Sequence, residues 1–583
     1  MYKLTFGTPE IHVPSRYCKS FSYTETPVSF PAEQIRFRQN SRGCVLSFPL
    51  EADTQVYGFG LQLKQFNHKG RKLKLSVNAD PVVPTGDSHA PVPFFVTNKG
   101  WGMYIDTARY AEFYCGNQMN PVYGKNPACS GGCVCGGSTA ETDTANTPAD
   151  NTDDLYALRE LSGQVMTIQI PACEGVDVYI IEGGNITDIV SQYNMLSGGG
   201  CDVPDWGLGV LYRCYTKYTA DRVIAMADEF RGKDIPLHII GLEPGWQTHT
   251  YSCSYVWSDL YPDPAGFLAE MQKRDVHINL WQHAFTHPTS PIHDEIAPHS
   301  ADTLVWDGVV PDFATEEARS IFRDYQKKAL VEAGIDGFKL DECDSSDNTG
   351  SWSFPLCARF PSGMDGEQYH SLFGTLYAQV LMEALGETKT LSEIRNLGAL
   401  AAPYPFVLYS DLYDHRDFIR GVTTAPFSGL LWSPEVRHAG SREELIRRLQ
   451  VVVFSVQCLI NAWYCPDVPW RELDCEAEVK ELLQLRVALM PRLTEAFRLY
   501  RETGKPPVRA LVMDWTDDPE VWGMDDEYMF CEDLLVAPIA AGCGDTRKVY
   551  LPAGDWADYF TGEAVSAGWH EVQTDGIPVY RKR

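Results

Sequence analysis

The segment Gly337-Phe338-Lys339-Leu340-Asp341-Glu342-Cys343-Asp344 joins a short apolar run to a dense group of carboxylates. A buried strand that ends in carboxylates would present them at its carboxyl end, where the catalytic groups of a (β/α)8 barrel gather. For one isolated Asp-Glu pair, a helix cap or a solvated acidic loop would be the better interpretation. The catalytic interpretation therefore depends on whether other predicted strands end in the same way.

Several other predicted strands do end in residues that suit carbohydrate chemistry. Aromatic rings stack on the apolar faces of pyranose rings, and carboxylates accept hydrogen bonds from sugar hydroxyls. A single tryptophan is more often part of a core than a sugar platform, but several at successive strand ends favour a pocket. The strand-end residues are Glu243, Trp246, Trp281, Asp411, Trp432 and Glu435.

Cleavage of a glycosidic bond needs two carboxyl groups that flank the bond, one protonated and one ionised. The candidates are Asp341, Asp411, Glu435 and Glu243, and their residue types alone do not rank them. Two carboxyl groups suffice for this chemistry. We therefore predict no metal and no organic cofactor.

Residues 204–505 show the alternation of strands and helices that is typical of parallel βαβ units. The number of units predicts a (β/α)8 TIM barrel. Strands are expected at 208–212, 237–242, 277–281, 337–341 and 405–409, and helices at 219–231, 264–274 and 316–333. The connections 283–311 and 344–366 are long for barrel loops, so they are candidates for functional excursions.

The flanking regions carry the alternating pattern of antiparallel β-structure. Residues 1–203 are predicted to form a β-sandwich, and residues 506–583 a short C-terminal β-sheet domain. A low-complexity stretch at 126–154 is expected to form a loop. Its cysteines, Cys129, Cys133 and Cys135, do not have a standard zinc spacing, so we expect thiols rather than a metal site.

The bulk composition limits the partners of this chain. Its 583 residues carry a formal net charge of -29, which argues against nucleic acid and an anionic membrane surface. No stretch of 18 apolar residues and no secretory signal is recognisable, and the cysteine count of 17 is odd. These features predict a cytoplasmic location with no membrane partner. An oligosaccharide or glycoside substrate and a homo-oligomer are both compatible with the sequence.

The chain resembles glycoside hydrolase family 31 over nearly its whole length. The segment 337–341 matches the nucleophile motif of that family closely. Further segments resemble the family in the expected order: 57–60, 305–313, 427–435, 447–450, 489–491, 534–538 and 549–556. Relatives continue beyond Tyr580, so we expect a C-terminal domain that is minimal or shortened.

The resemblance assigns roles to individual residues. Asp341 takes the nucleophile position. Arg395 and then Asp411 fit the family's order of an arginine followed by the acid/base, which leaves Glu435 as the runner-up acid/base. Substrate-binding positions are expected at Glu243, Trp246, Trp281, Trp306, Lys339, Arg395, Trp432 and Asn461.

The departures from the family pattern concern specificity. Glu243 stands where the family usually has Asp, and Asn461 where it usually has a sugar-binding His. We therefore expect a retaining exo-α-glycosidase that is not a plain maltose-type α-glucosidase, with α-galactosidase activity a contender. The alternatives are an α-glucosidase proper, an α-glucan lyase or a transglycosylase. Retention of the motif residues argues against a non-catalytic carbohydrate-binding protein.

Overall fold

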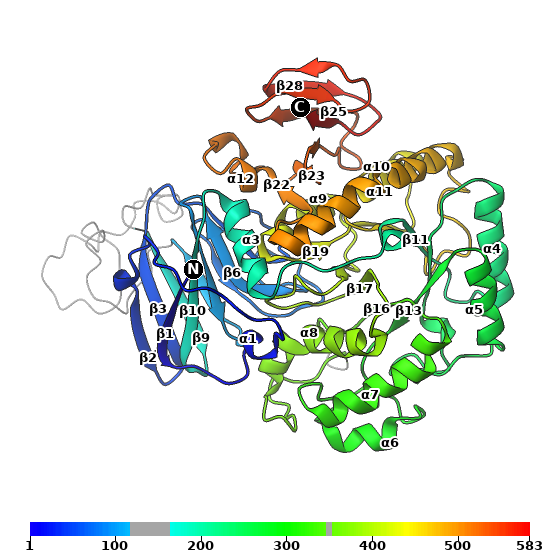
Figure 1. Cartoon of the computed structure of the whole chain (residues 1–583), viewed down its shortest axis with the longest axis horizontal. Helices are drawn as coiled ribbons and strands as arrows, with labels where there is room; N and C mark the ends of the chain where they lie inside the picture. The colour runs from blue at the N-terminus through cyan, green and yellow to red at the C-terminus, as the bar shows by residue number, and fades with distance from the viewer. Residues whose placement is uncertain (117–163, 346–351) are drawn as a thin grey trace, which may run out of the picture.

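The computed structural model describes residues 1–116, 164–345 and 352–583. Figure 1 shows a β-sandwich that carries the N-terminus, a barrel beside it, and a group of C-terminal strands stacked on the barrel. The predicted architecture, a (β/α)8 barrel with an N-terminal β-sandwich and a small C-terminal β-domain, is confirmed. The three cysteines of the 126–154 stretch lie outside the described residues.

Two five-stranded antiparallel sheets form the sandwich. Apolar side chains such as Val56, Phe95 and Ile168 fill the space between them and are fully buried. One sheet has the order β1 (Tyr2–Thr8), β10 (Glu174–Glu182), β7 (Trp101–Asp106), β6 (Pro91–Thr97) and β4 (Val56–Gly60). The other has the order β2 (Arg36–Asn40), β3 (Gly43–Leu50), β9 (Gln164–Pro171), β8 (Glu112–Cys115) and β5 (Lys72–Lys74).

The sequence pattern of the first region did not predict the helix α3 (Ile186–Leu196), which follows the sandwich strands. The Asn185 side chain caps it by accepting a hydrogen bond from the backbone N–H of Asp188. Its buried face includes Ile189, Val190 and Tyr193, and the Tyr193 ring stacks on Phe94 of β6. This apolar stripe explains why a helix forms here and where it packs.

The barrel sheet is parallel throughout and closes on itself. Its strand order is β19-β18-β17-β16-β13-β12-β11-β21-β20, and only Ser433 and Pro434 separate the two terminal strands. The ring therefore closes through one broken strand, which gives eight strand positions. The strands are β11 (Val210–Arg213), β12 (Ile239–Leu242), β13 (His277–Gln282), β16 (Gly337–Leu340), β17 (Ser392–Ile394), β18 (Phe406–Leu408), β19 (Leu431–Trp432), β20 (Glu435–Val436) and β21 (Cys458–Asn461).

Helices surround this sheet, and several of them begin at residues with capping side chains. Thr219 caps α4, Asp263 caps α5 and Asp365 closes a capping box on α8. The helices are α4 (Ala220–Gly232), α5 (Pro264–Lys273), α6 (His293–Ile296), α7 (Glu316–Ala329), α8 (Gly366–Leu385), α9 (His415–Thr424), α10 (Arg442–Val453) and α11 (Glu476–Thr503). The predicted helix at 316–333 ends at Ala329, after which 331–333 form a 3-10 turn closed by the left-handed Gly334.

The C-terminal strands form one six-stranded antiparallel sheet and one two-stranded antiparallel sheet. β22 packs against α9 of the barrel. The sheet contains β22 (Val508–Ala510), β23 (Tyr528–Phe530), β24 (Leu534–Val536), β29 (Val579–Lys582), β26 (Trp556–Asp558) and β27 (Ala564–Val565), and the two-stranded sheet pairs β25 (Thr546–Leu551) with β28 (Gly568–Gln573).

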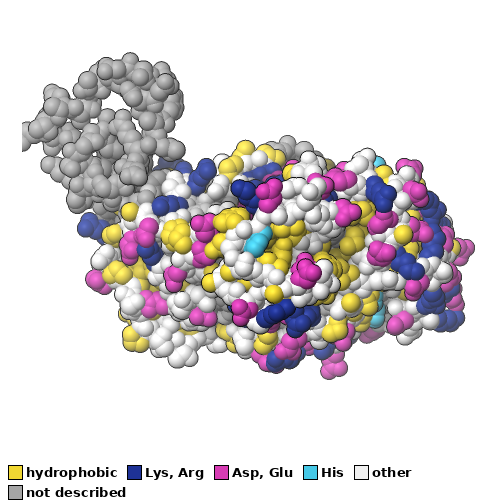
Figure 2. All heavy atoms as spheres, turned by 90° about the horizontal axis from the view of Figure 1, so that it is seen from above, with side chains coloured by type: hydrophobic (Ala, Val, Ile, Leu, Met, Phe, Trp, Pro, Cys, Tyr) yellow, Lys and Arg dark blue, Asp and Glu magenta, His cyan; other side chains and the backbone are white. Residues whose placement is uncertain are grey.

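The sandwich is fastened to the barrel by buried contacts. The Tyr57 ring stacks on Phe427 with centroids 5.2 Å apart, and the Gly60 N–H donates to Ser428 Oγ at 2.9 Å. On the face seen in Figure 2, basic and acidic side chains are interspersed with hydrophobic ones. Within the described parts of the chain, no helix combines the length and the apolar character needed to cross a membrane.

Candidate active site

Asp341 follows β16 and is held by two donors at the carboxyl end of the barrel. The Trp281 indole donates to its Oδ2 at 2.6 Å, and the backbone N–H of Glu342 donates to its Oδ1 at 3.0 Å. Asp341 is only 9% exposed, so only a small part of the residue is accessible to solvent. This leaves one face of a fixed carboxylate available to a bound molecule.

The Arg395 guanidinium connects three carboxylates. It follows β17 and donates from Nε to Asp344 Oδ2 at 2.9 Å and from Nη1 to Asp411 Oδ2 at 2.6 Å. Its Nε also lies 4.0 Å from Asp341 Oδ1. Because parallel strands end at one rim, residues distant in the sequence meet around this single cation.

The two candidate catalytic carboxyls differ in environment. Burial raises the pKa of Asp341 above its usual value, although Arg395 and Lys339 oppose the change. Desolvation also acts on Asp411, but Arg395 and Arg437 outweigh it and hold its pKa well below the usual range. The Asp411 side chain is 65% exposed, so water moderates this effect. In the sugar-free protein the proton therefore favours Asp341 over Asp411.

A buried layer of charges lies beneath these carboxylates. Glu243, at the end of β12, accepts hydrogen bonds from Arg213 Nε and, at 3.3 Å, from Lys339 Nζ. The same arginine donates from Nη1 to Glu393 Oε2 at 2.6 Å and to Asn279 Oδ1 at 2.9 Å. Since the charges are paired and hydrogen-bonded, the barrel can hold them out of water.

Gly241 makes room for this charge layer. A Cβ at that position would lie 2.7 Å from Cζ of Arg213 and 2.8 Å from its Cγ. Such contacts are too short for any side chain, so only glycine allows the guanidinium to lie against β12.

Glu435 lies deeper than Asp411 and is already paired. It is 1% exposed and accepts hydrogen bonds from Arg437 Nε and, at 2.9 Å, from Asn461 Nδ2. Arg437 also donates to the carbonyl oxygens of Ser410 at 2.6 Å and Asp411 at 3.1 Å. Asn461 is fully buried, so in this structure it contacts Glu435 rather than the open mouth.

An aromatic rim borders the mouth on the side of Asp341. Trp306 contacts Tyr251 and Trp352 edge to face, with centroid distances of 5.0 and 5.6 Å, and Tyr251 lies 5.5 Å from Trp281. Tyr251 and Trp352 are 44% and 45% exposed. Such exposed rings beside a polar site are suited to stacking on sugar rings.

Backbone strain marks the same rim. Trp306 and Asp307 form the two-residue turn between β14 (Ser300–Val305) and β15 (Gly308–Pro311), and both have positive φ angles, 50° and 62°. Turns of this type normally use Asn and Gly. A tryptophan held in that conformation is a feature that accompanies functional sites.

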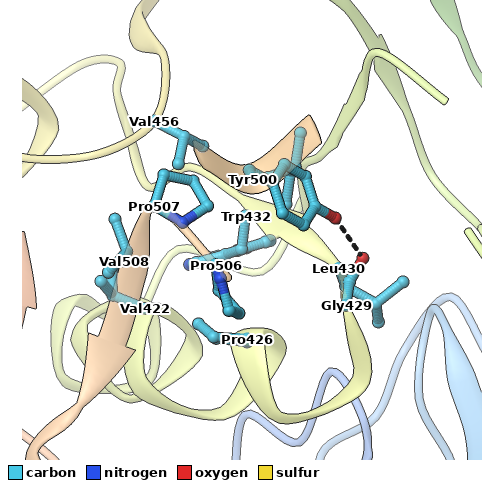
Figure 3. Close-up of a pocket in the computed structure, with 11 residues that line it drawn as sticks. Val422, Pro426, Gly429, Leu430, Trp432, Val456, Tyr500, Pro506, Pro507 and Val508 are labelled. Atoms are coloured by element: carbon cyan, nitrogen blue, oxygen red, sulfur yellow. Dashed lines mark hydrogen bonds between the residues drawn. The ribbon is translucent and has the colours of Figure 1, made fainter. Parts of the chain in front are cut away.

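Two of the predicted sugar-binding tryptophans lie away from the mouth. Trp246 is 1% exposed and donates from its indole to the carbonyl of Trp281 at 2.6 Å, so it supports that residue from behind. Trp432 donates to the carbonyl of Phe418 at 3.1 Å and lines an apolar cavity with Tyr500 and Val508. Figure 3 shows this cavity between α9 and the first C-terminal strand. This placement argues against a sugar contact for Trp432.

Sequence reasoning missed several residues of the network. Arg213 ends β11 and Glu393 lies in the middle of β17, so a charged residue in or at the end of a buried strand was the available signal. Glu342 adjoins the nucleophile candidate with φ of 57°, and burial and the nearby Asp341 raise its pKa well above the usual value. His89 belongs to the sandwich, and no local pattern indicates its contact with Asp344.

The arrangement suits a reaction that uses two carboxyls at a sugar's anomeric carbon. One carboxylate is fixed by an indole and a backbone N–H, and the other is exposed and bound by Nη1 of Arg395. Among the described residues, no group of three or more His, Cys, Asp or Glu side chains is placed to hold a metal ion.

Three family models match the chain. "Glycosyl hydrolases family 31 TIM-barrel domain" matches residues 201–496, "Glycosyl hydrolase family 31 C-terminal domain" matches 504–583, and "Glycosyl hydrolase 31 N-terminal galactose mutarotase-like domain" matches 21–113. The first of these covers just over half of the chain.

Curated relatives and solved structures extend this likeness. An α-xylosidase of Emericella nidulans is 25% identical over 95% of this chain and 68% of its own length. The α-xylosidase XylQ of Lactiplantibacillus pentosus is 22% identical over 88% of this chain and 65% of its own length. The chain thus spans about two thirds of the length of these relatives. The Flavobacterium johnsoniae GH31 dextranase complexed with glucose superposes with a TM-score of 0.79 at 20% identity, over 94% of this chain and 67% of that one.

Proposed function

The chain belongs to glycoside hydrolase family 31, and on that premise we propose that it is a retaining exo-α-glycosidase that hydrolyses terminal α-linked sugars. The observation that carries the proposal is the pair of carboxylates that Arg395 brings together, Asp411 at its Nη1 and Asp341 4.0 Å from its Nε, with the Trp281 indole fixing Asp341. Two carboxyls that flank one position are the requirement of the retaining mechanism.

The proposed mechanism has two displacements. In the first, Asp341 attacks the anomeric carbon, the bond to the leaving oxygen breaks, and Asp411 gives its proton to that oxygen. In the second, Asp411 takes a proton from water, the water oxygen attacks the anomeric carbon, and the ester bond to Asp341 breaks. The sugar leaves with its configuration retained, and both carboxyls return to their starting state.

The surroundings of the carboxyls support Asp411 over Glu435 as the acid/base. A group that exchanges protons with a leaving group and with water must be accessible to both. Asp411 is exposed at the mouth, whereas Glu435 is buried and has donors on both oxygens. Glu435 is better suited to holding Arg437 and Asn461 in place.

The acid role requires Asp411 to carry a proton that Arg395 disfavours. A bound sugar would displace water from Asp411, and this desolvation favours the protonated form of the carboxyl. A leaving oxygen beside Arg395 would also compete for the guanidinium. The Asp411 charge raises the pKa of Asp341, so the protonation of one carboxyl favours the ionisation of the other. The active form is then the minor arrangement in which Asp341 is ionised and Asp411 is protonated.

The charges of the site favour a neutral sugar. The basic groups near the mouth are already committed: Arg213 to Glu243 and Glu393, Arg437 to Glu435, and Arg395 to Asp344 and Asp411. A sulfonate or carboxylate on the sugar would meet more carboxylates than free cations, at an energetic cost. We therefore propose a neutral hexose or pentose as the glycone.

The position of Glu243 supports a specificity other than maltose-type α-glucosidase. Its carboxylate is fixed by Arg213 and Lys339, so its remaining acceptor sites have a fixed position and favour sugars whose hydroxyls match that position. Two of the relatives described above carry the name α-xylosidase, which adds α-xylosides to α-galactosides as candidate substrates. A glucan lyase or transglycosylase would use the same nucleophile and differ in product.

The experiment is a panel of 4-nitrophenyl α-glycosides: xyloside, galactoside, glucoside, N-acetylgalactosaminide and sulfoquinovoside, with maltose and isomaltose beside them. The wild-type chain should cleave one neutral glycoside best, with an α-anomeric first product by NMR. An unsaturated product would indicate a lyase, and larger saccharides a transglycosylase. Equal efficiency on maltose would make ordinary α-glucosidase the right description, and no turnover on any arm would refute the enzyme proposal. Asp341→Ala serves as the blank.

A further inference from the structure

A segment of the sandwich domain reaches into the mouth of the barrel. Ser88 pairs with Val77, and the N–H of Asn78 donates to the carbonyl of Ser88 at 2.8 Å, so residues 76–90 hold one another in place. From this segment the N–H of Ala79 donates to the carbonyl of Ser345 at 2.6 Å. The side chain of His89, just before β6, is fully buried against the barrel.

Both ring nitrogens of His89 are engaged by residues beside the catalytic carboxyls. Nδ1 lies 2.7 Å from Asp344 Oδ2, and Nε2 lies 2.7 Å from the hydroxyl oxygen of Ser410. Burial alone would raise the pKa of Asp344, but Arg395 and His89 hold it below its usual value, so this carboxylate accepts. Nδ1 therefore donates to Asp344, since a carboxylate only accepts, and Nε2 is hydrogen-bonded to the Ser410 hydroxyl.

The contact continues to the proposed acid/base. Asp344 Oδ2, which accepts from His89, also accepts from Arg395 Nε at 2.9 Å, and Arg395 Nη1 donates to Asp411 at 2.6 Å. We propose that His89 is a positioning residue through which the sandwich domain completes the active site: it fixes Asp344, which fixes the Arg395 guanidinium between Asp341 and Asp411. This inference rests on the proposed function.

A purely structural role would look different. Tyr57 is also buried in the sandwich and donates across the domain boundary, from its hydroxyl to the carbonyl of Trp522 at 2.9 Å. That bond ends at a backbone carbonyl and touches no carboxylate. His89 instead meets a carboxylate and a hydroxyl that adjoin catalytic positions. The two residues thus give a matched comparison between an inter-domain bond at the site and one away from it.

The test uses four variants of the full chain: His89→Asn, His89→Gln, His89→Ala and Tyr57→Phe. The amide nitrogen of Asn takes the place of Nδ1 and can still donate to Asp344. The amide of Gln takes the place of Nε2, so it can keep the hydrogen bond with Ser410 but loses the one with Asp344. Each variant is measured for melting temperature and for kcat/KM across pH on the best substrate of the panel. The charged groups that face the two catalytic carboxyls are Arg395, Lys339, Arg437, Glu342 and Asp344.

We expect His89→Gln and His89→Ala to lose about 10- to 100-fold in kcat/KM, because small misplacements of catalytic groups have effects of this size. Their bell-shaped pH profiles should move to higher pH, since a loosened Arg395 lowers the pKa of the catalytic pair less. His89→Asn and Tyr57→Phe should keep the wild-type profile, even if Tyr57→Phe melts as early as His89→Ala.

The inference is overturned if His89→Gln matches the wild type, if His89→Asn is as impaired as His89→Ala, or if no profile moves. These outcomes require an active wild type, so they differ from failure of the proposed function, in which the wild-type chain cleaves nothing on the panel. In that case the double-mutant cycle of His89→Ala with Asp344→Asn still measures the contact: additive melting shifts would show that the two side chains do not interact.

Discussion

The mouth around Asp341 and the cavity around Trp432 each contain a tryptophan at the end of a barrel strand, yet the two environments differ. At the mouth, Trp281 donates to a carboxylate, and charges are paired through Arg395 and Arg213. At the cavity, Trp432 is enclosed by prolines, valines and Tyr500. A tryptophan at a strand end therefore indicates a sugar site only where carboxylates accompany it.

A glycine accompanies each region for the same geometric reason. Gly241 lets Arg213 lie against β12, and Gly421 of α9 lets the Trp432 indole approach, since a Cβ there would lie 2.5 Å from its Nε1. In the first region the space serves a charge network that can act on a substrate. In the second it serves packing between the barrel and the C-terminal strands. We expect substitutions to separate these two roles.

The largest expected effect is at the mouth. Asp341→Ala should reduce kcat/KM by at least about 10⁴-fold, because it removes the nucleophile itself. The melting temperature should fall little or rise, since burial raises the pKa of this carboxyl and the folded state gains nothing from its charge. Steady-state kinetics and circular dichroism on one preparation measure both. If Asp341→Ala keeps a tenth of the wild-type kcat/KM, Asp341 is not the nucleophile.

Asp411→Ala should follow, with a loss that depends on the leaving group. Proton donation contributes about 10²- to 10⁴-fold for poor leaving groups and little for activated aryl groups. Alkyl glycosides should thus lose far more rate than nitrophenyl glycosides, and azide should restore the aryl reaction. The control is Glu435→Ala, which should impair both substrates alike. If Glu435→Ala shows the leaving-group dependence and Asp411→Ala does not, the two roles must be exchanged.

The cavity should respond in stability instead. Trp432→Ala removes a large buried ring and should cost about 3–5 kcal/mol in the free energy of unfolding, while kcat/KM of the folded fraction stays near wild type. Trp306→Ala at the rim is the matched control. It should cost about 1 kcal/mol or less in the free energy of unfolding and should raise KM. Urea unfolding and initial rates compare the two. If Trp432→Ala keeps wild-type stability but loses activity, Trp432 contacts the sugar and this interpretation of the cavity is wrong.

The smallest expected displacement is that of the pH profile, which is measured separately from the loss of rate that the Arg395 variants share with His89→Ala. Arg395 lowers the pKa of both Asp341 and Asp411. Replacing its charge in Arg395→Met should therefore move both limbs of the kcat/KM profile to higher pH, by about one unit. Arg395→Lys keeps the charge and should move them less. Limbs that stay in place, or that move to lower pH, would show that this guanidinium does not set the ionisation of the pair.

Much of the fold follows from patterns that are local in the sequence. The alternation of strands and helices predicted the barrel, and the turn at Asp341 follows β16 as expected. The helix α3 was missed because it follows a long run of strand-like segments and its apolar stripe is only three turns long. Its capping residue, Asn185, was the available signal.

The site was predictable only where its chemistry lies at strand ends. Asp341, Asp411 and Arg395 meet as the sequence and the family resemblance suggested. Trp432 could not be separated from Trp281, because residue type and position are the same and only the neighbours differ. His89 could not be found at all, since its contact with Asp344 joins residues 255 positions apart in different domains.

The central claim, that the mouth is a retaining site with Asp341 as its nucleophile, is tested most directly by trapping the glycosyl-enzyme. A 5-fluoro-α-glycosyl fluoride of the preferred sugar should inactivate the protein, and peptide mapping should find one glycosyl group on the carboxylate of Asp341. Label on Asp411, Glu435 or Glu342, or inactivation-free turnover with inverted product, would contradict the account.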